Sequence, residues 1–193
     1  MPSRPPAVEL RLLLRRLPWA LVVALALWAL ARPAYDRFLC RATRTLARAL
    51  ESPPAALVVR DGDHALLGRS DLAPDAAKLR FSLTQVHFNL VPFLALTLAL
   101  PGALAAGRWR RLLVALVVFA VAHVLALFFQ LRGHYAFSLG TWSLANVSNL
   151  ERNLVGTARL FFDIVVTFGL PFVAWATAFR ESVAKLAGLT AAG

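Results

Sequence analysis

The 193-residue chain contains little cysteine, little acid and few charges of any kind. Cys40 is its only cysteine, so the chain can form no internal disulfide and contains no Cys-x-x-Cys motif. Charged residues make up 16% of the sequence, whereas an average soluble domain has about 25%. The 10 acidic residues are outnumbered by 21 basic ones, which gives a net charge of +11. This composition excludes a disulfide framework within the chain and argues against an ordinary soluble domain.

A basic chain can bind nucleic acid or anionic lipid, or its charge can be a signal of membrane orientation. Here the basic residues lie between apolar runs and are not gathered on one soluble face. The sequence has no zinc-ligand spacing, no aromatic RNA-binding pattern and no phosphate-binding loop. We therefore expect no nucleic-acid partner, no cofactor and no metal site.

Apolar sequence is what the chain has in abundance. Hydrophobic residues account for 59% of it, and its mean hydropathy is +0.65. A helix needs about 20 apolar residues to cross a bilayer. Four stretches approach or exceed this length, namely residues 14–31, 82–106, 112–131 and 160–179. We predict an all-α integral membrane protein, with a bundle of about four transmembrane helices in a single membrane domain over residues 1–193.

The first of these stretches is the shortest. Its uncharged part, residues 17–31, lies between Arg16 and Arg32, whose long side chains can reach the membrane interfaces. Trp19 and Trp28 suit the same interfaces. Basic residues before an apolar run can also mark a signal peptide, but no small-x-small cleavage site follows. We favour an uncleaved membrane anchor.

The orientation in the membrane is predicted from basic residues in short loops, which favour the cytoplasmic side. Arg108, Arg110 and Arg111 lie between the second and third predicted spans, and four arginines precede the first. We expect both termini on the cytoplasmic side of a bacterial inner membrane. Nine basic residues within 32–80 argue against this orientation, although six acidic residues accompany them.

Residues 33–80 are predicted to form a small extracytoplasmic insert. Apolar and basic residues recur at helical spacing over 35–50, which is typical of an amphipathic helix. This helix could lie on anionic lipid, or its charged face could be solvated and cover the mouth of the bundle. The apolar runs 56–60 and 64–67 flank Asp61-Gly62-Asp63 and predict a β-hairpin, which needs support from the rest of the protein.

Polar side chains are predicted to converge at one membrane face. With four spans, the second and fourth begin outside and the third ends outside. The residues of this candidate cleft are Gln85, His87, Asn89, Gln130, Arg132, His134, Asn149, Arg152, Asn153, Arg159 and Asp163. They could bond one another and hold the helices together, or they could line an outward-facing cleft for a peptide terminus or lipid headgroup. His123, in the middle of the third span, is expected to hydrogen-bond between helices in preference to relaying protons.

The order of features from Gln85 to Leu131 resembles the exosortase and archaeosortase group of bacterial and archaeal membrane proteins. A polar helix start (85–89) precedes an apolar span, an arginine-rich turn (108–111) and another span with polar residues at its outer end (130–134). The resemblance implies a transpeptidase-like system that acts on C-terminal sorting tails outside the membrane, with a cysteine nucleophile supported by arginine and histidine. This chain has no cysteine at the start of its second span, because Cys40 lies in the insert.

Without that thiolate, the resemblance implies a noncatalytic associate, similar to the small membrane proteins that accompany exosortases. We therefore expect an accessory membrane protein of a protein-sorting or envelope-assembly system. Its partners would be membrane lipid and another membrane protein or a sorting tail. The alternative is a membrane enzyme with His87 or His134 as base and Arg132 or Arg152 as an anion clamp. A small transporter or channel subunit is disfavoured because the spans contain so few charges.

Overall fold

The computed structural model describes residues 6–73, 76–103, 105 and 108–187 of the chain. These residues are mostly helical and form two compact units, each of which is described by itself. The helical unit consists of residues 1–30, 89–119 and 168–193. The sheet unit consists of residues 31–88 and 120–167.

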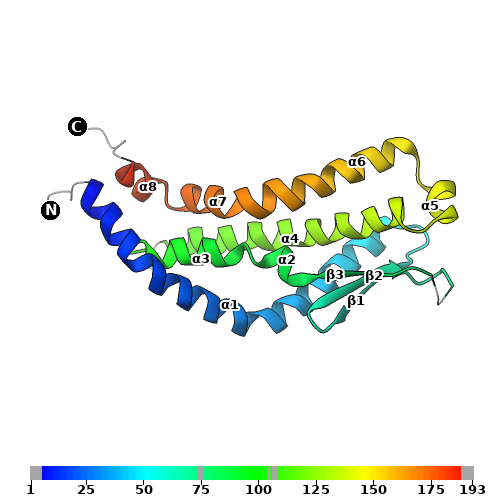
Figure 1. Ribbon diagram of the computed structural model, residues 1–193, viewed down its shortest axis with the longest axis horizontal. Helices are drawn as coiled ribbons and strands as arrows, with labels where there is room; N and C mark the ends of the chain where they lie inside the picture. The colour runs from blue at the N-terminus through cyan, green and yellow to red at the C-terminus, as the bar shows by residue number, and fades with distance from the viewer. Residues whose placement is uncertain (1–5, 74–75, 104, 106–107, 188–193) are drawn as a thin grey trace. The chain divides into compact units, whose positions relative to one another are not determined.

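Helix α1 (Pro6–Leu50) is one continuous helix of 45 residues (Figure 1). We predicted a membrane helix that ends near Arg32-Pro33 and a separate amphipathic helix after it, but the second helix continues the first. A proline in a helix interior costs about 3 kcal/mol, because its backbone donates no hydrogen bond and its ring clashes with the preceding turn. Burial of the turns that follow offsets this cost, since Leu39, Cys40 and Ala47 are part of the core of the sheet unit.

Strands β1 (Ala56–Asp61) and β2 (His64–Arg69) form the predicted hairpin. They pair antiparallel with Asp61 opposite His64, so Gly62 and Asp63 make a two-residue turn. Gly62 has a φ of 57°, and hairpin turns of this length require positive φ. The predicted hairpin is therefore confirmed, with Gly62 and Asp63 as its two turn residues and Asp61 as the last residue of β1.

The hairpin is supported in two ways. A third strand, β3 (Leu79–Ser82), pairs antiparallel with β2, in the residues just before the predicted second span. One face of the sheet is buried: Val58 and Leu67 belong to an apolar cluster with Leu127, Leu131 and Tyr135 of helix α4 (Trp109–Phe137). The expectation that the hairpin leans on the rest of the protein is confirmed.

The predicted second span, 82–106, is shorter and less regular than expected. Helices α2 (Leu83–His87) and α3 (Leu90–Ala99) meet at Phe88 and Asn89 and together cover 17 residues. Leu100 has an extended backbone, with ψ of 122°, and Pro101-Gly102 follow at the predicted helix end. The two helices lie in different units, α2 in the sheet unit and α3 in the helical unit.

The described residues after α4 are helical apart from short turns. Helix α5 (Thr141–Asn146) precedes a run made of α6 (Asn149–Leu160), the π-helical segment η1 (Phe161–Gly169) and α7 (Leu170–Ala178). Helix α8 (Arg180–Leu186) follows. Ser148 caps α6 by accepting a hydrogen bond from the backbone nitrogen of Glu151 at 3.2 Å. The helical run therefore begins 11 residues before the predicted span 160–179.

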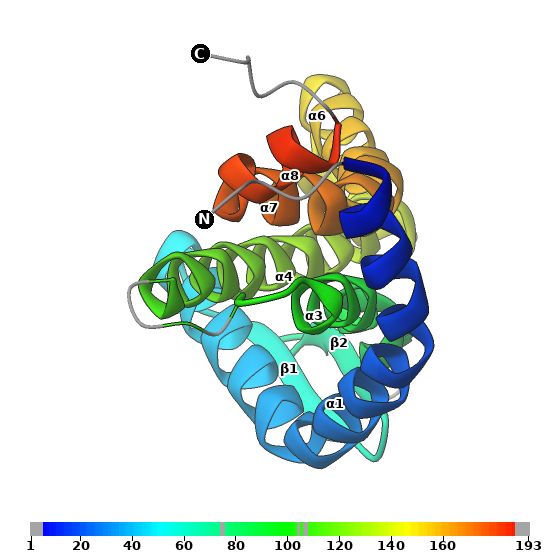
Figure 2. The same cartoon turned by 90° about the vertical axis from the view of Figure 1, so that its left-hand side faces the viewer.

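Within the helical unit, several helix ends lie together. Leu13 in α1, Leu100 after α3 and Phe179 after α7 belong to one apolar cluster. Arg108, just before α4, donates a hydrogen bond to the hydroxyl of Ser182 in α8 at 3.4 Å. Figure 2 shows α3 next to both α1 and α4. The start of α1, the end of α3, the start of α4 and the end of α7 therefore share one end of this unit.

Among the described residues, three helices are long and apolar enough to cross a membrane: Leu10–Leu50, Trp109–Phe137 and Asn149–Ala178. In the most apolar part of the third, only 6% of the residues are buried within the protein. Exposed side chains such as Leu160, Ile164 and Phe168 would be costly in water. These helices are compatible with a membrane protein.

Candidate functional site

The structure divides the predicted cleft residues between the two units. Asn89 alone belongs to the helical unit, where it is buried at the first turn of α3. The other ten lie in the sheet unit, in which they form several separate groups. Gln85, Asn149 and Asn153 are exposed on α2 and α6. The remaining residues make specific contacts, which are described in turn.

Asp36, one of the six acidic residues within 32–80, is fully buried. Its Oδ1 accepts a hydrogen bond from Nε2 of His87 at 2.8 Å. Arg32 and Arg60 approach its Oδ2, with nitrogen–oxygen distances of 3.8 and 3.7 Å. Arg32 also pairs with Asp63 at 2.9 Å. We call these five residues the Asp36 network; they join α1, the hairpin and α2.

Tyr35 extends this network to α4. Its hydroxyl shares a hydrogen bond of 2.8 Å with Nδ1 of His123. The Tyr35 ring meets the rings of both His87 and His123 edge-on, with centroids 5.5 and 5.9 Å apart. The expectation that His123 hydrogen-bonds between helices is confirmed.

A second polar group joins α4 to the point where α6 continues into η1. Nε2 of Gln130 donates a hydrogen bond to Oδ1 of Asp163 at 2.7 Å. Nε of Arg159 lies 3.8 Å from Oδ2 of Asp163, and their four-residue spacing places both side chains on one helix face. The side chains of Arg159 and Asp163 are 39% and 42% exposed. We call Gln130, Arg159 and Asp163 the Asp163 patch.

Three other predicted cleft residues hold loops and helices in place. Arg132 of α4 forms an ion pair with Glu151 of α6. Nε2 of His134 donates to the backbone carbonyl of Ala77 at 2.9 Å. Arg152 donates to the backbone carbonyl of Ser143 at 2.8 Å. These contacts fit the interpretation that part of the polar constellation joins the helices.

Charge also organises the end of the hairpin. Arg69 donates two hydrogen bonds to Asp71, at 2.9 and 2.7 Å. These bonds hold the pKa of the Asp71 carboxyl below its usual value. The Arg69 guanidinium also lies over the Trp142 ring, 4.4 Å from its centroid, so the sheet is joined to α5 by a cation–π contact.

The Asp36 network and the Asp163 patch differ in the chemistry that they could support. The Asp36–His87 pair has the geometry in which a carboxylate orients an imidazole base, but both side chains are buried. In the Asp163 patch, Arg159 and Asp163 are half-exposed and lie among exposed apolar side chains, including Leu160, Phe161 and Ile164, whereas Gln130 is buried. Among the described residues, no group of three His, Cys, Asp or Glu side chains is arranged to hold a metal ion. The patch is therefore the more accessible candidate for binding.

Sequence reasoning missed Asp36, Tyr35 and Arg60. The four-residue spacing of Arg32 and Asp36 was visible and indicates an ion pair on one helix face. The contacts with Arg60 and His87 depend on how distant segments pack, which no local pattern reveals.

No protein-family model, curated protein or solved structure matches this chain.

Proposed function

We propose that this chain is an integral membrane protein with a noncatalytic, accessory role, and that its Asp163 patch binds a transmembrane segment of a partner protein. The resemblance of residues 85–131 to exosortase-group proteins suggests the context, a protein-sorting or envelope-assembly system. In that context the partner segment would be a sorting tail or a helix of the processing enzyme.

The arrangement of the helical unit supports a four-span topology with both termini inside. In an up-and-down bundle of four helices, the start of the first helix, the end of the second, the start of the third and the end of the fourth lie at one face. The corresponding ends of α1, α3, α4 and α7 lie together in the helical unit. Arg108, Arg110 and Arg111 lie at this end, and basic residues favour the cytoplasmic side. The 17 residues of Leu83–Ala99 are at the lower limit for crossing a bilayer.

The observation that carries the partner-binding proposal is the position of Asp163 and Arg159 on the least buried of the long helices. Half-exposed ionised groups are costly where apolar neighbours face lipid, and such groups normally face a protein partner or water. A partner helix with a polar or basic residue at this depth would complete their hydrogen bonds. The π-helical segment that contains Asp163 adds support, because such segments frequently occur at functional sites.

Photo-crosslinking in intact membranes tests this proposal. A photoreactive residue at Ile164, next to the patch, is expected to form an adduct whose crosslinked peptide comes from a transmembrane segment of another protein. Adding Asp163→Leu should lower the adduct yield at least fivefold. A photoreactive residue at Val117 is the control, because it is equally apolar and exposed but lies in the helical unit. Equal yields with and without Asp163→Leu would reject the patch as the binding site.

A membrane enzyme is the second candidate, favoured by the 2.8 Å hydrogen bond between His87 and Asp36. In this case His87 would act as a base after an opening motion exposed it. The variants His87→Ala, His134→Ala and Asp163→Ala should then each fail to restore the wild-type phenotype in cells that lack this protein. If all three variants restore the wild-type phenotype at normal protein levels, the enzyme hypothesis fails.

A further inference from the structure

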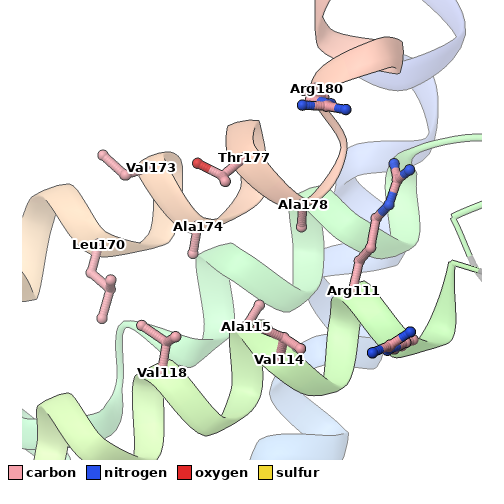
Figure 3. A pocket seen from close by; sticks show the side chains of 11 residues that line it. Arg111, Val114, Ala115, Val118, Leu170, Val173, Ala174, Thr177, Ala178 and Arg180 are labelled. Atoms are coloured by element: carbon pink, nitrogen blue, oxygen red, sulfur yellow. The ribbon is translucent and has the colours of Figure 1, made fainter.

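A groove between α4 and α7 lies in the helical unit, whereas the residues of the Asp163 patch belong to the sheet unit. Its volume is about 690 Å³, within the usual range for small-molecule sites. Figure 3 shows Arg111 and Arg180 at one end, and Leu170 and Val118 at the other. The groove is therefore basic at one end and apolar along the rest of its length.

The apolar part of the groove opens to the surroundings. Val114, Val118 and Val173 line it and are 58%, 46% and 63% exposed. Small residues such as Ala174, together with these valines, offer a surface without hydrogen-bonding groups, apart from the Thr177 hydroxyl. Such a surface suits a flexible hydrocarbon chain, whose contact with it depends on apolar area and not on directed bonds.

The basic end carries an excess of positive charge. Arg110, Arg111 and Arg180 line it, and one acid is paired there: Glu181, which accepts from Arg111 at 3.1 Å. The hydrogen bond from Arg111 lowers the pKa of the Glu181 carboxyl, so Glu181 is ionised at neutral pH. Three arginines and one glutamate leave a net charge of +2 at the groove's end. Guanidinium groups bind phosphate with two parallel hydrogen bonds, which makes arginine the preferred partner of this anion.

We propose that this groove binds an anionic phospholipid, with its phosphate headgroup at Arg110, Arg111 and Arg180 and one acyl chain along the valines. Basic pockets between transmembrane helices are known to take such headgroups. The inference rests on the membrane location proposed above but is independent of partner binding at the Asp163 patch.

Native mass spectrometry of the detergent-purified full chain tests the inference with three probes. These are phosphatidylglycerol, phosphatidylcholine with the same acyl chains, and inorganic phosphate. The wild-type chain should bind phosphatidylglycerol at least about tenfold more tightly than phosphatidylcholine. Arg110→Gln/Arg111→Gln should lose this preference. The matched control Arg15→Gln/Arg16→Gln removes the same charge elsewhere in the helical unit and should retain it.

A second variant probes the acyl chain's place without changing charge. Thr177→Trp, at an exposed position on the groove, should weaken phosphatidylglycerol binding at least fivefold while the arginines remain. Val173→Phe serves the same purpose if the tryptophan variant does not fold. Undiminished lipid binding by a folded groove-filling variant would overturn the assignment.

The remaining outcomes are equally decisive. An equal loss of preference in the Arg15/Arg16 control would mean that the general positive field attracts the lipid, and would overturn the site. Full competition by inorganic phosphate would assign the arginines to a free anion and overturn the lipid proposal. Alkaline carbonate extraction distinguishes failure of the proposed membrane function from failure of the lipid site. If the chain is released from membranes, the proposed membrane function fails. If the chain is retained but shows no lipid preference, only this inference fails.

Discussion

At the scale of single residues, Asp36 links three elements of the sheet unit. Its carboxylate binds His87 of α2 and lies near Arg60 of the hairpin, while its own helix supplies Arg32. A buried charge of this kind is tolerated only when its partners compensate the loss of water. Removing the carboxylate would abolish the hydrogen bond from His87 and remove the negative charge that lies near Arg32 and Arg60.

We therefore expect Asp36→Ala to lower the free energy of unfolding by about 3–5 kcal/mol. Thermal or denaturant unfolding in mild detergent, monitored by circular dichroism, measures the change. Asp71→Ala is the matched control, because it removes an exposed carboxylate that also pairs with an arginine; its cost should stay below about 1 kcal/mol. Similar costs for the two variants would contradict the account of the Asp36 network.

At the scale of elements, the hairpin depends on one backbone conformation. Gly62 has a φ of 57°, and a Cβ at this position would meet no neighbour within 4 Å. Any cost of a side chain here is therefore conformational and not steric crowding by the rest of the protein. Asparagine tolerates this left-handed conformation much better than alanine.

We expect Gly62→Ala to destabilise the protein by about 1 kcal/mol and Gly62→Asn by clearly less. Amide hydrogen exchange of β1 and β2 measures the effect locally, with faster exchange in the alanine variant. If alanine and asparagine have the same effect, the left-handed conformation is not what the turn requires.

At the scale of the whole molecule, the number of membrane crossings determines on which side of the membrane each loop and each polar group lies. Trp109 and Ser138 lie at opposite ends of the candidate span α4, and with the N-terminus inside, Trp109 lies inside if Leu83–Ala99 crosses the bilayer. If it does not, α4 runs in the other direction and Trp109 lies outside. The basic residues around Trp109 favour the first arrangement.

Cysteine accessibility mapping on intact cells measures this directly. In a Cys40→Ser background, single cysteines at Ser70, Trp109 and Ser138 would be treated with an impermeant thiol reagent. We expect labelling at positions 70 and 138 and none at 109. Labelling at 109 alone would invert the protein, place the polar groups of the sheet unit in the cytoplasm and remove the basis for the sorting-system proposal.

The features that follow local rules could be predicted from the sequence. Asp61-Gly62-Asp63 between two apolar runs predicts the hairpin, and the four-residue spacing of Arg159 and Asp163 indicates their ion pair. In both cases the interacting residues are close in the chain, so their spacing in the sequence determines how they meet.

Other features depend on packing between distant segments. The helix α1 continues through Pro33 because its later turns are buried against the sheet and α4, although a proline locally disfavours it. Asp36 resembles a solvated acid of the insert in sequence, and only the packing that brings Arg60 and His87 to it shows that it is buried. Strand β3 has only four residues, and it is a strand because it pairs with β2.

The core of the sheet unit also has a consequence for biosynthesis. Leu127, Leu131 and Tyr135, which cover the hairpin, are translated about 60 residues after strand β2 ends at Arg69. At roughly 5–20 residues per second, the ribosome adds them on the order of 3–13 seconds later. The apolar face of the hairpin therefore emerges long before its cover is made. Between these two events it depends on a chaperone, the translocation machinery or the membrane surface to avoid aggregation, so the order of synthesis determines when this protein is most vulnerable.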